Sequence, residues 1–161
     1  MIDSISVIVP VANEPQNIQR TLESICRHIS LPKEILVIYD SDTDATLPIL
    51  DKIKIDFHDL KIIKNNIHPG PSGALITGFN EASKKYILVM MADLCDDISE
   101  IDKTITRFSP SFDIVSFSRF LTGGSVKLKK PKKRLNRIFF KHYLKLFLPK
   151  LASFFMGSFG G

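Results

Sequence analysis

The 161-residue sequence has few cysteines and no apolar segment long enough to cross a lipid bilayer. Its two cysteines, Cys26 and Cys95, match no metal-binding spacing, and two thiols are ordinary in a reducing compartment. The first residues, MIDSISVIVPV, contain an early acid and no basic residue, so we expect no signal peptide. Towards the other end, Lys141, Lys145 and Lys150 interrupt the apolar residues, which argues against a transmembrane helix there.

Three familiar catalytic signatures are also absent. The sequence contains no G-x-x-x-x-G-K-[ST] phosphate loop, and no G-x-G-x-x-G fingerprint follows its first apolar segment. The histidines fit neither a metal-ligand spacing nor a Ser-His-Asp set; they are His28, His58, His68 and His142. These absences argue against a P-loop NTPase, a dinucleotide-binding enzyme, a histidine-ligated metalloenzyme and a serine hydrolase.

Acidic residues are missing from the last part of the chain. All 17 of them precede residue 127, whereas ten of the 22 lysines and arginines follow residue 126. Residues 1–126 therefore carry a net charge of −5, and residues 127–161 a net charge of +10. We expect two parts: a domain over residues 1–126 and a basic tail over residues 127–161.

Within the domain, short apolar segments alternate with segments of helical periodicity. Such an alternation across short loops predicts an α/β sandwich with a mostly parallel central sheet. Strands are expected at residues 5–10, 34–39, 60–64, 86–91 and 113–118. Helices are expected near residues 15–29, 42–57, 74–83 and 98–108, with Asp42 or Asp44 capping the second one.

The segment YILVMMADLCDDISE, residues 86–100, joins a buried strand to an acidic loop. Asp97 and Ser99 are explained by capping the helix that follows. Asp93 is not, because it lies directly after the apolar run, where ligands bind in parallel sheets. Carboxylates suit Mg²⁺ or Mn²⁺, so we predict a metal site at Asp93, with Asp96 as a further ligand.

Polar side chains follow four of the predicted strands: Asn13 and Glu14, Asp40, Asp93 and Asp96, and Ser118 and Arg119. The carboxyl ends of parallel strands meet at one edge of the sheet, so these groups are expected to lie near one another. The first two acidic groups can accept hydrogen bonds from a base and a ribose, a carboxylate can hold a metal, and the arginine can pair with phosphate. Together these groups predict a nucleoside-diphosphate site. The Gly70–Gly73 loop, followed by a helix N-terminus, also suits an anion.

Five blocks carry a family resemblance, in this order: SVIVPVANEPQNI, LVIYDSDTDAT, GPSGALITGFNEAS, YILVMMADLCDDISEI and DIVSFSRFLTGG. Over roughly residues 4–124, the sequence resembles family-two glycosyltransferases of the GT-A fold. It is most similar to their dolichyl-phosphate mannose synthase-like branch, which transfers sugars to polyprenyl phosphates. The resemblance implies a GT-A-like, Rossmann-type sandwich.

The resemblance also implies roles for individual residues. Pro10, Ala12 and Glu14 match the nucleoside-contacting P-x-Y-N-E block, and Ile38 and Asp40 match second-strand positions that hold base and ribose. Ala92 and Asp93 fall on the last two positions of the metal-binding D-x-D, and Arg119 falls on an arginine that approaches the phosphates. Asp93 and Arg119 are thus the implied catalytic residues.

The sequence departs from the family pattern at Met91, which replaces the first aspartate of D-x-D, and at Tyr39, which replaces the first of two paired aspartates. Asp93 then has to hold the metal with fewer protein ligands, helped by Asp96 or water. A later D-x-x-S-G-F-like stretch of the acceptor half is also missing from the sequence.

The implied activity is a metal-dependent, inverting transfer of a sugar from a nucleotide sugar to a polyprenyl phosphate at the cytoplasmic face of the membrane. Because the acceptor half is missing, a second hypothesis stays open. In it, the chain is a truncated, non-catalytic nucleotide-binding module that docks on a membrane or on a partner subunit.

The basic tail allows two interpretations. Residues 128–137, LKKPKKRLNR, precede IFFKHYLKLFLPKLASFFMGSF, in which apolar and basic residues are interleaved. This pattern is typical of a basic amphipathic helix on an anionic membrane surface, and equally of a helix that packs on the sheet with solvated lysines. A nucleic-acid partner is not expected, because the main domain is acidic and no groove-reading module is present.

Overall fold

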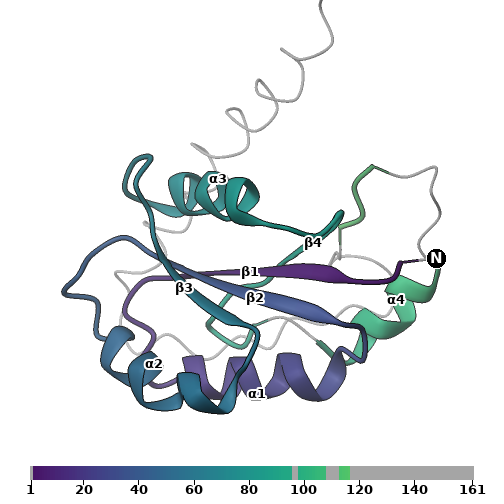
Figure 1. Cartoon of the computed structure of the whole chain (residues 1–161), viewed down its shortest axis with the longest axis horizontal. Helices are drawn as coiled ribbons and strands as arrows, with labels where there is room; N and C mark the ends of the chain where they lie inside the picture. Colours follow the sequence, from purple (N-terminus) through teal and green to yellow (C-terminus); the bar gives the residue numbers. More distant parts are fainter. Residues whose placement is uncertain (1, 96–97, 108–112, 117–161) are drawn as a thin grey trace, which may run out of the picture. The chain divides into compact units, whose positions relative to one another are not determined.

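The computed structural model describes residues 2–95, 98–107 and 113–116 (Figure 1). The chain divides into two compact units, Met1–Val115 and Ser116–Gly161, and almost all of the second lies outside the described residues. The strands are β1 (Ile5–Val11), β2 (Lys33–Tyr39), β3 (Leu60–Lys64) and β4 (Tyr86–Val89). The α-helices are α1 (Ile18–His28), α2 (Leu47–Ile53), α3 (Pro71–Glu81) and α4 (Ile101–Arg107), and 3₁₀ turns η1 and η2 cover Lys54–Asp56 and Ile98–Glu100.

The four described strands form one parallel sheet in the order β3-β2-β1-β4. The central strand β1 has a partner on each side, so that Val7 is paired with Ile35 of β2 and with Leu88 of β4. The chain moves outward from β1 to β2 and β3, and then crosses back to place β4 on the other side of β1. The expected α/β fold with a parallel sheet is therefore confirmed.

Both faces of the central strands are covered, which explains why their sequences are continuously apolar. Figure 1 shows α1 and α2 on one face of the sheet and α3 on the other. Val7, Val9 and Val37 belong to the larger core, which includes buried residues of α1 and α2. Ile8 and Leu36 point the opposite way and pack with Ala74 of α3. Alternate side chains of one strand thus enter two separate cores.

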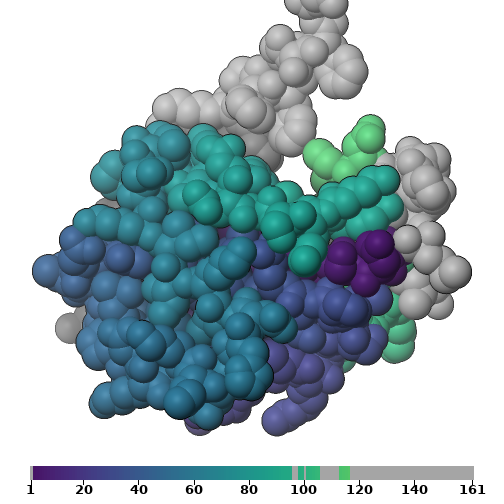
Figure 2. All heavy atoms as spheres, in the orientation of Figure 1, coloured from purple at the N-terminus to yellow at the C-terminus, as the bar shows by residue number. Residues whose placement is uncertain are grey.

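The two helical layers contact the sheet in different ways. Helix α1 buries Ile18, Leu22 and Ile25, which recur at helical spacing, against the larger core. Helix α3 packs tightly on β1 at Gly78, where an added Cβ atom would lie 2.5 Å from Ile8 Cγ2. In Figure 2, the teal atoms of α3 lie directly against the blue atoms of the neighbouring sheet segments.

Several element boundaries differ from the sequence-based expectation. Helix α3 begins at Pro71 rather than at residue 74, because proline is well accommodated in the first turn and the expected loop becomes that turn. The second helix is short and continues as η1, so it does not run unbroken to Phe57. Of the strand expected at residues 113–118, residues 113–116 form no strand in the structure, and 117–118 lie outside the described residues.

A buried carboxylate ties the strands to the α3–β4 connection. Glu34 of β2 accepts hydrogen bonds from Ser6 Oγ (2.6 Å), the Ser83 backbone N–H (2.6 Å) and Lys61 Nζ (2.9 Å). Burial alone raises the pKa of Glu34, but the hydrogen bonds from Ser6, Lys61 and Ser83 outweigh it and lower the pKa to about 2. Glu34 is therefore ionised and fully engaged in holding the sheet together at neutral pH.

Among the described residues, none of the helices has the length and the apolar character needed to span a membrane. The basic tail, residues 127–161, lies outside the described residues, so its two interpretations stay predictions.

Candidate functional site

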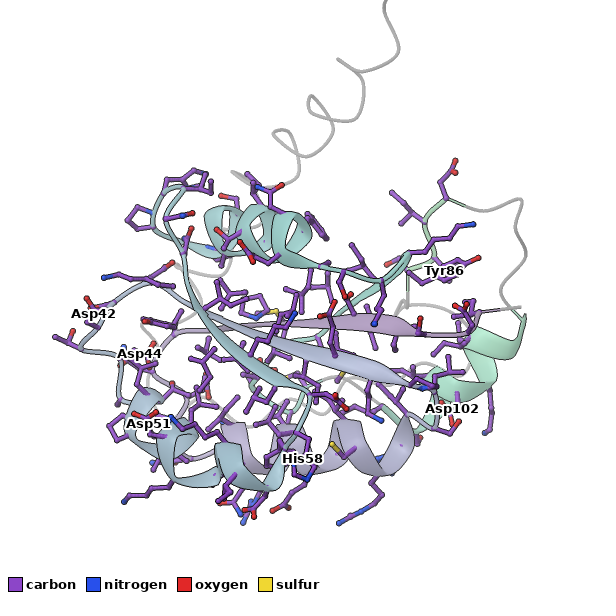
Figure 3. All side chains as sticks on the ribbon, viewed as in Figure 1. Asp42, Asp44, Asp51, His58, Tyr86 and Asp102 are labelled. Carbon is purple, nitrogen blue, oxygen red and sulfur yellow. The ribbon has the colours of Figure 1, made fainter. Side chains whose placement is uncertain are left out.

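The carboxyl ends of all four strands lie at the same edge of the sheet, because the strands are parallel. Four loops leave from this edge: residues 12–17, 40–46, 65–70 and 90–95. Figure 3 labels Asp42 and Asp44 at this edge, whereas Tyr86 and Asp102 lie towards the opposite end. The strand order reverses between β1 and β4, and such a reversal marks the usual ligand position in open parallel sheets.

The predicted nucleoside-contacting residues of β1 and β2 are neighbours in the structure. Pro10 is paired with Ile38 in the strand register, and both are buried. Ala12 is exposed just beyond the end of β1. Glu14 is half-buried, and its Oε2 accepts a hydrogen bond of 2.8 Å from Asn17 Nδ2. The structure thus brings this predicted set together at one point of the edge.

The loop after β1 is held by the loop after β2. The Asn13 N–H donates to Asp44 Oδ2 (3.0 Å), and Asn13 Oδ1 accepts from the Ala45 N–H (3.1 Å). The Glu14 N–H donates to Thr46 Oγ1 (2.9 Å), while the Thr46 N–H donates to Asp44 Oδ1 (2.7 Å). Three hydrogen bonds therefore join the two loops.

Asp44 is the buried charge in this contact, with 6% of its surface exposed. Burial raises the pKa of its carboxyl group, but the hydrogen bonds from Thr46 and Asn13 outweigh that effect and leave the pKa below its usual value. The sequence indicates only helix capping for Asp44. Its Oδ1 does serve the residue that precedes α2, but its other oxygen serves a residue 31 positions earlier in the chain.

Asp40, the predicted ribose or base ligand, has structural partners on both carboxylate oxygens. Asn65 Nδ2 donates to Oδ1 (2.6 Å) and the Gly70 N–H donates to Oδ2 (2.7 Å). Asn65 also receives hydrogen bonds on its Oδ1 from the Ile67 N–H (3.1 Å) and Thr77 Oγ1 (2.9 Å). Asp40 and Asn65 together fix the loop between β3 and α3 at the carboxyl edge of the sheet.

That loop also packs tightly against α3. A Cβ atom at Gly73 would lie 1.9 Å from the His68 carbonyl oxygen, so only glycine fits there. Sequence analysis missed the role of Asn65, whose only signal is its position directly after a strand. A polar residue at the carboxyl end of each strand is the pattern that would have found it.

The end of β4 presents the predicted metal ligand. Ala92 is buried, and its carbonyl oxygen accepts a hydrogen bond of 3.0 Å from Thr21 Oγ1 of α1. Asp93 is exposed, and its Oδ1 accepts the Cys95 N–H (3.0 Å) in a turn that places Leu94 at a φ of 59°. The structure therefore aims a carboxylate outward at the point where the strand order reverses.

No cluster of three or more His, Cys, Asp or Glu side chains suited to a metal occurs in the part of the chain that the structure describes. Asp96, the second predicted metal ligand, and Arg119, the predicted phosphate ligand, lie outside the described residues. An exposed single carboxylate fits Mg²⁺ or Mn²⁺ in one respect, because such ions keep several waters and also bind substrate phosphates.

Comparison with known proteins gives the family. The model of the family "Glycosyl transferase family 2" matches residues 6–161. The chain is 33% identical to a dolichol-phosphate mannosyltransferase of Pyrococcus furiosus over 124 residues, which are 76% of this chain and 35% of that protein. It is 28% identical to an undecaprenyl-phosphate 4-deoxy-4-formamido-L-arabinose transferase of Proteus mirabilis, over 87% of this chain and 44% of that protein.

Among solved structures, the chain is similar to the mannosyltransferase PcManGT of Pyrobaculum calidifontis in complex with GDP-Man and Mn²⁺. The TM-score is 0.50 at 26% sequence identity, with 55% of this chain and 27% of that chain covered. In each of these comparisons the match spans less than half the length of the relative. The match to the family model over almost the whole sequence and the parallel α/β fold lead to one conclusion: the chain belongs to glycosyl transferase family 2.

Proposed function

We propose that the carboxyl edge of the sheet binds a nucleotide sugar and that the chain serves the transfer of the sugar to a polyprenyl phosphate, with the nucleoside diphosphate as the leaving group. The observation that carries this proposal is the juxtaposition of the predicted nucleoside residues, Pro10 beside Ile38, with Glu14 and Asp40 in the adjacent loops. The relatives support the choice of substrates, because their names include dolichol phosphate and undecaprenyl phosphate.

Each residue has a chemical part in the proposal. Glu14 and Asp40 accept hydrogen bonds from the nucleoside, since a carboxylate oxygen keeps acceptor capacity beyond one partner. Asp93, with Asp96, holds Mg²⁺ or Mn²⁺, and Arg119 pairs with the phosphates. When bound, the metal neutralises charge that develops on the departing nucleoside diphosphate.

The proposed reaction inverts the anomeric carbon by direct displacement. A phosphate acceptor is already an anion at neutral pH, so the attacking oxygen needs no strong general base. The placement of the acceptor in a lipid, together with the ten positive charges of residues 127–161, favours action at the inner face of the membrane.

Binding can be tested on the full chain by thermal unfolding and by calorimetric titration with UDP, GDP and their sugars, with and without Mn²⁺. A ligand that binds only the folded state raises the unfolding midpoint. We expect one of the two nucleotides to raise it, and more strongly with Mn²⁺ than without. Identical midpoints and no heat of binding with all of these ligands would overturn the proposal.

Transfer is tested separately from binding, with vesicles that contain a polyprenyl phosphate and a radiolabelled nucleotide sugar. Radiolabel in the lipid fraction supports the proposal that the chain is a glycosyltransferase. Nucleotide binding without label in the lipid supports the alternative, a non-catalytic binding module.

A further inference from the structure

The loop after β1 has a conformation that its own sequence does not dictate. Asn13 has a φ of 57°, a value that few non-glycine residues adopt. Both its N–H and its side-chain oxygen are bound to the loop after β2, through Asp44 and Ala45. The next residue, Glu14, is bound to the same loop through Thr46. The shape of the first loop is therefore set by the second.

We propose that Asp44 is a positioning residue of the nucleotide site: it acts through Asn13 and Glu14 and does not itself touch the nucleotide. The effect of Asp44 on nucleotide affinity rests on the proposed function. The effect of Asp44 on the conformation of the loop after β1 does not depend on that function, so loop conformation and nucleotide affinity can be measured separately.

A carboxylate at position 44 can accept two hydrogen bonds on two different oxygens, which asparagine and alanine cannot. Two backbone N–H groups from different loops, those of Asn13 and Thr46, point at the two oxygens of one buried side chain. Asparagine offers one oxygen and would turn an NH₂ group towards the other N–H. Alanine would leave both N–H groups without this partner, and that of Thr46 is buried. Aspartate is thus the residue that can satisfy both loops at once.

The position of Glu14 follows from this contact. Its backbone N–H is fixed by Thr46, and its carboxylate is fixed by Asn17 at the start of α1. If Asp44 releases Asn13, the chain loses one of the anchors that orient Glu14 at the edge. The side chain of Glu14, which is predicted to contact the nucleoside, would then sample several orientations, and nucleotide binding would have to select one of them.

The first experiment measures amide hydrogen exchange on the full chain without ligand, for the wild type, Asp44→Asn and Asp42→Asn. Asp42 is the matched control, because it belongs to the same loop but is exposed and pairs with Lys64 on the surface. We expect the amide that faces the new NH₂ group, that of Asn13 or that of Thr46, to exchange about tenfold faster in Asp44→Asn, the size expected for losing a hydrogen bond to a charged group. The amides of β1 and β2 keep their protection.

The second experiment titrates UDP and GDP into the same proteins, with and without Mn²⁺. We expect Asp44→Asn to lower the affinity for whichever nucleotide the wild type binds by about tenfold, both with and without Mn²⁺. The reason is that Asp44 orients residues that contact the nucleoside and not the metal. Asp42→Asn binds like the wild type. A general loss of stability would leave the affinity unchanged, with and without metal, in a protein that is still fully folded at the assay temperature.

Thr46 provides a second pair of variants in case Asp44→Asn does not fold. Thr46→Val removes the oxygen that accepts a hydrogen bond from the Glu14 N–H, whereas Thr46→Ser keeps a hydroxyl oxygen at this position. We expect weaker binding in the first and near-normal binding in the second. Unchanged exchange at both Asn13 and Thr46 in Asp44→Asn, or wild-type affinity in both Asp44→Asn and Thr46→Val, would overturn the proposal. If the wild type binds neither nucleotide, the proposed function fails, and the exchange experiment alone decides whether Asp44 holds the loop.

Discussion

Three aspartates at the carboxyl edge of the sheet differ in burial and in the partners of their carboxylates. Asp44 is buried, with backbone donors on both of its oxygens, whereas Asp93 is exposed at the end of β4. Asp40 lies between these extremes, with structural partners on both oxygens and a position beside the predicted nucleoside site. Substitutions at these positions are therefore expected to separate folding, nucleoside binding and metal binding.

Asp93→Asn should abolish the metal-dependent part of nucleoside-diphosphate binding and leave the fold intact. The side chain is exposed, so neutralising it removes a charge partner for the metal and little packing. Calorimetric titration of UDP and GDP with and without Mn²⁺ measures the effect, with Asp42→Asn as the control. A variant whose affinity still rises with Mn²⁺ as it does in the wild type would remove Asp93 from the metal site.

Asp40→Ala should weaken nucleotide binding by roughly 1.5–3 kcal/mol whether or not metal is present, the usual value of a hydrogen bond to a charged group. The same change also releases Asn65 and Gly70, so its thermal midpoint should fall as well. Asn65→Ala is the matched control, because it frees the loop but keeps the carboxylate. A loss of affinity in Asp40→Ala that appears only with metal would assign Asp40 to the metal site.

Glu34 makes folding stability depend on pH. Its pKa lies at about 2 in the folded chain, below the ordinary 4.5, so the folded state binds the proton less readily than the unfolded state. This stabilisation is fully present above pH 4.5 and is lost as the pH falls from 4.5 through about 2. Glu34→Gln should cost roughly 1–3 kcal/mol at pH 7. Urea unfolding should show that the difference in unfolding free energy between wild type and variant becomes smaller below pH 4.5. A difference that stays constant with pH would contradict this role of Glu34.

At the scale of elements, a side-chain hydrogen bond connects helix α1 with the loop after β4. Thr21 Oγ1 donates to the carbonyl oxygen of Ala92 (3.0 Å), the residue directly before Asp93, and is also 3.1 Å from the Asn17 carbonyl oxygen. Thr21 is fully buried, so water cannot replace this hydrogen bond. The helix that follows the predicted nucleoside loop thereby also supports the predicted metal loop.

Thr21→Val keeps the shape of the side chain and removes the donor. We expect a loss of about 1–3 kcal/mol in unfolding free energy, because the Ala92 carbonyl oxygen stays buried without its partner. Thr21→Ser, which retains the hydroxyl group, should lose less. Urea denaturation compares the two variants, and equal losses would mean that the methyl group rather than the hydrogen bond is what matters.

At the scale of the whole molecule, the order of elements and the parallel sheet could be predicted because each depends on local patterns. Leu60–Lys64 is a strand in both the prediction and the structure, since its apolar residues and its boundaries are local. The hydrogen-bond partners of Asp44 and Asn65 could not be predicted. Their partners Asn13 and Asp40 lie 31 and 25 positions away, and only the folded topology brings them within hydrogen-bond distance.

Residues 127–161 carry the prediction about membranes. On the membrane interpretation, the full chain should sediment with vesicles of anionic lipid and much less with zwitterionic ones, and high salt should release it. Replacing Lys129, Lys130, Lys132 and Lys133 by glutamine should weaken the binding by about 1 kcal/mol for each charge. A chain that ignores anionic vesicles, and that unfolds when residues 127–161 are deleted, would support the interpretation in which the tail packs on the sheet.

The position of β1 in the centre of an all-parallel sheet also has a consequence for synthesis on the ribosome. Ile5 is paired with Lys33 on one side and with Tyr86 on the other, so neither partner is a hairpin neighbour. At typical rates of about 5–20 residues per second, the β4 partner of β1 is made several seconds after β1 itself. During that interval one edge of β1, all of whose residues are buried in the folded chain, has no strand to pair with. The nascent chain is therefore most exposed to aggregation, and most open to chaperones, before β4 has emerged from the ribosome.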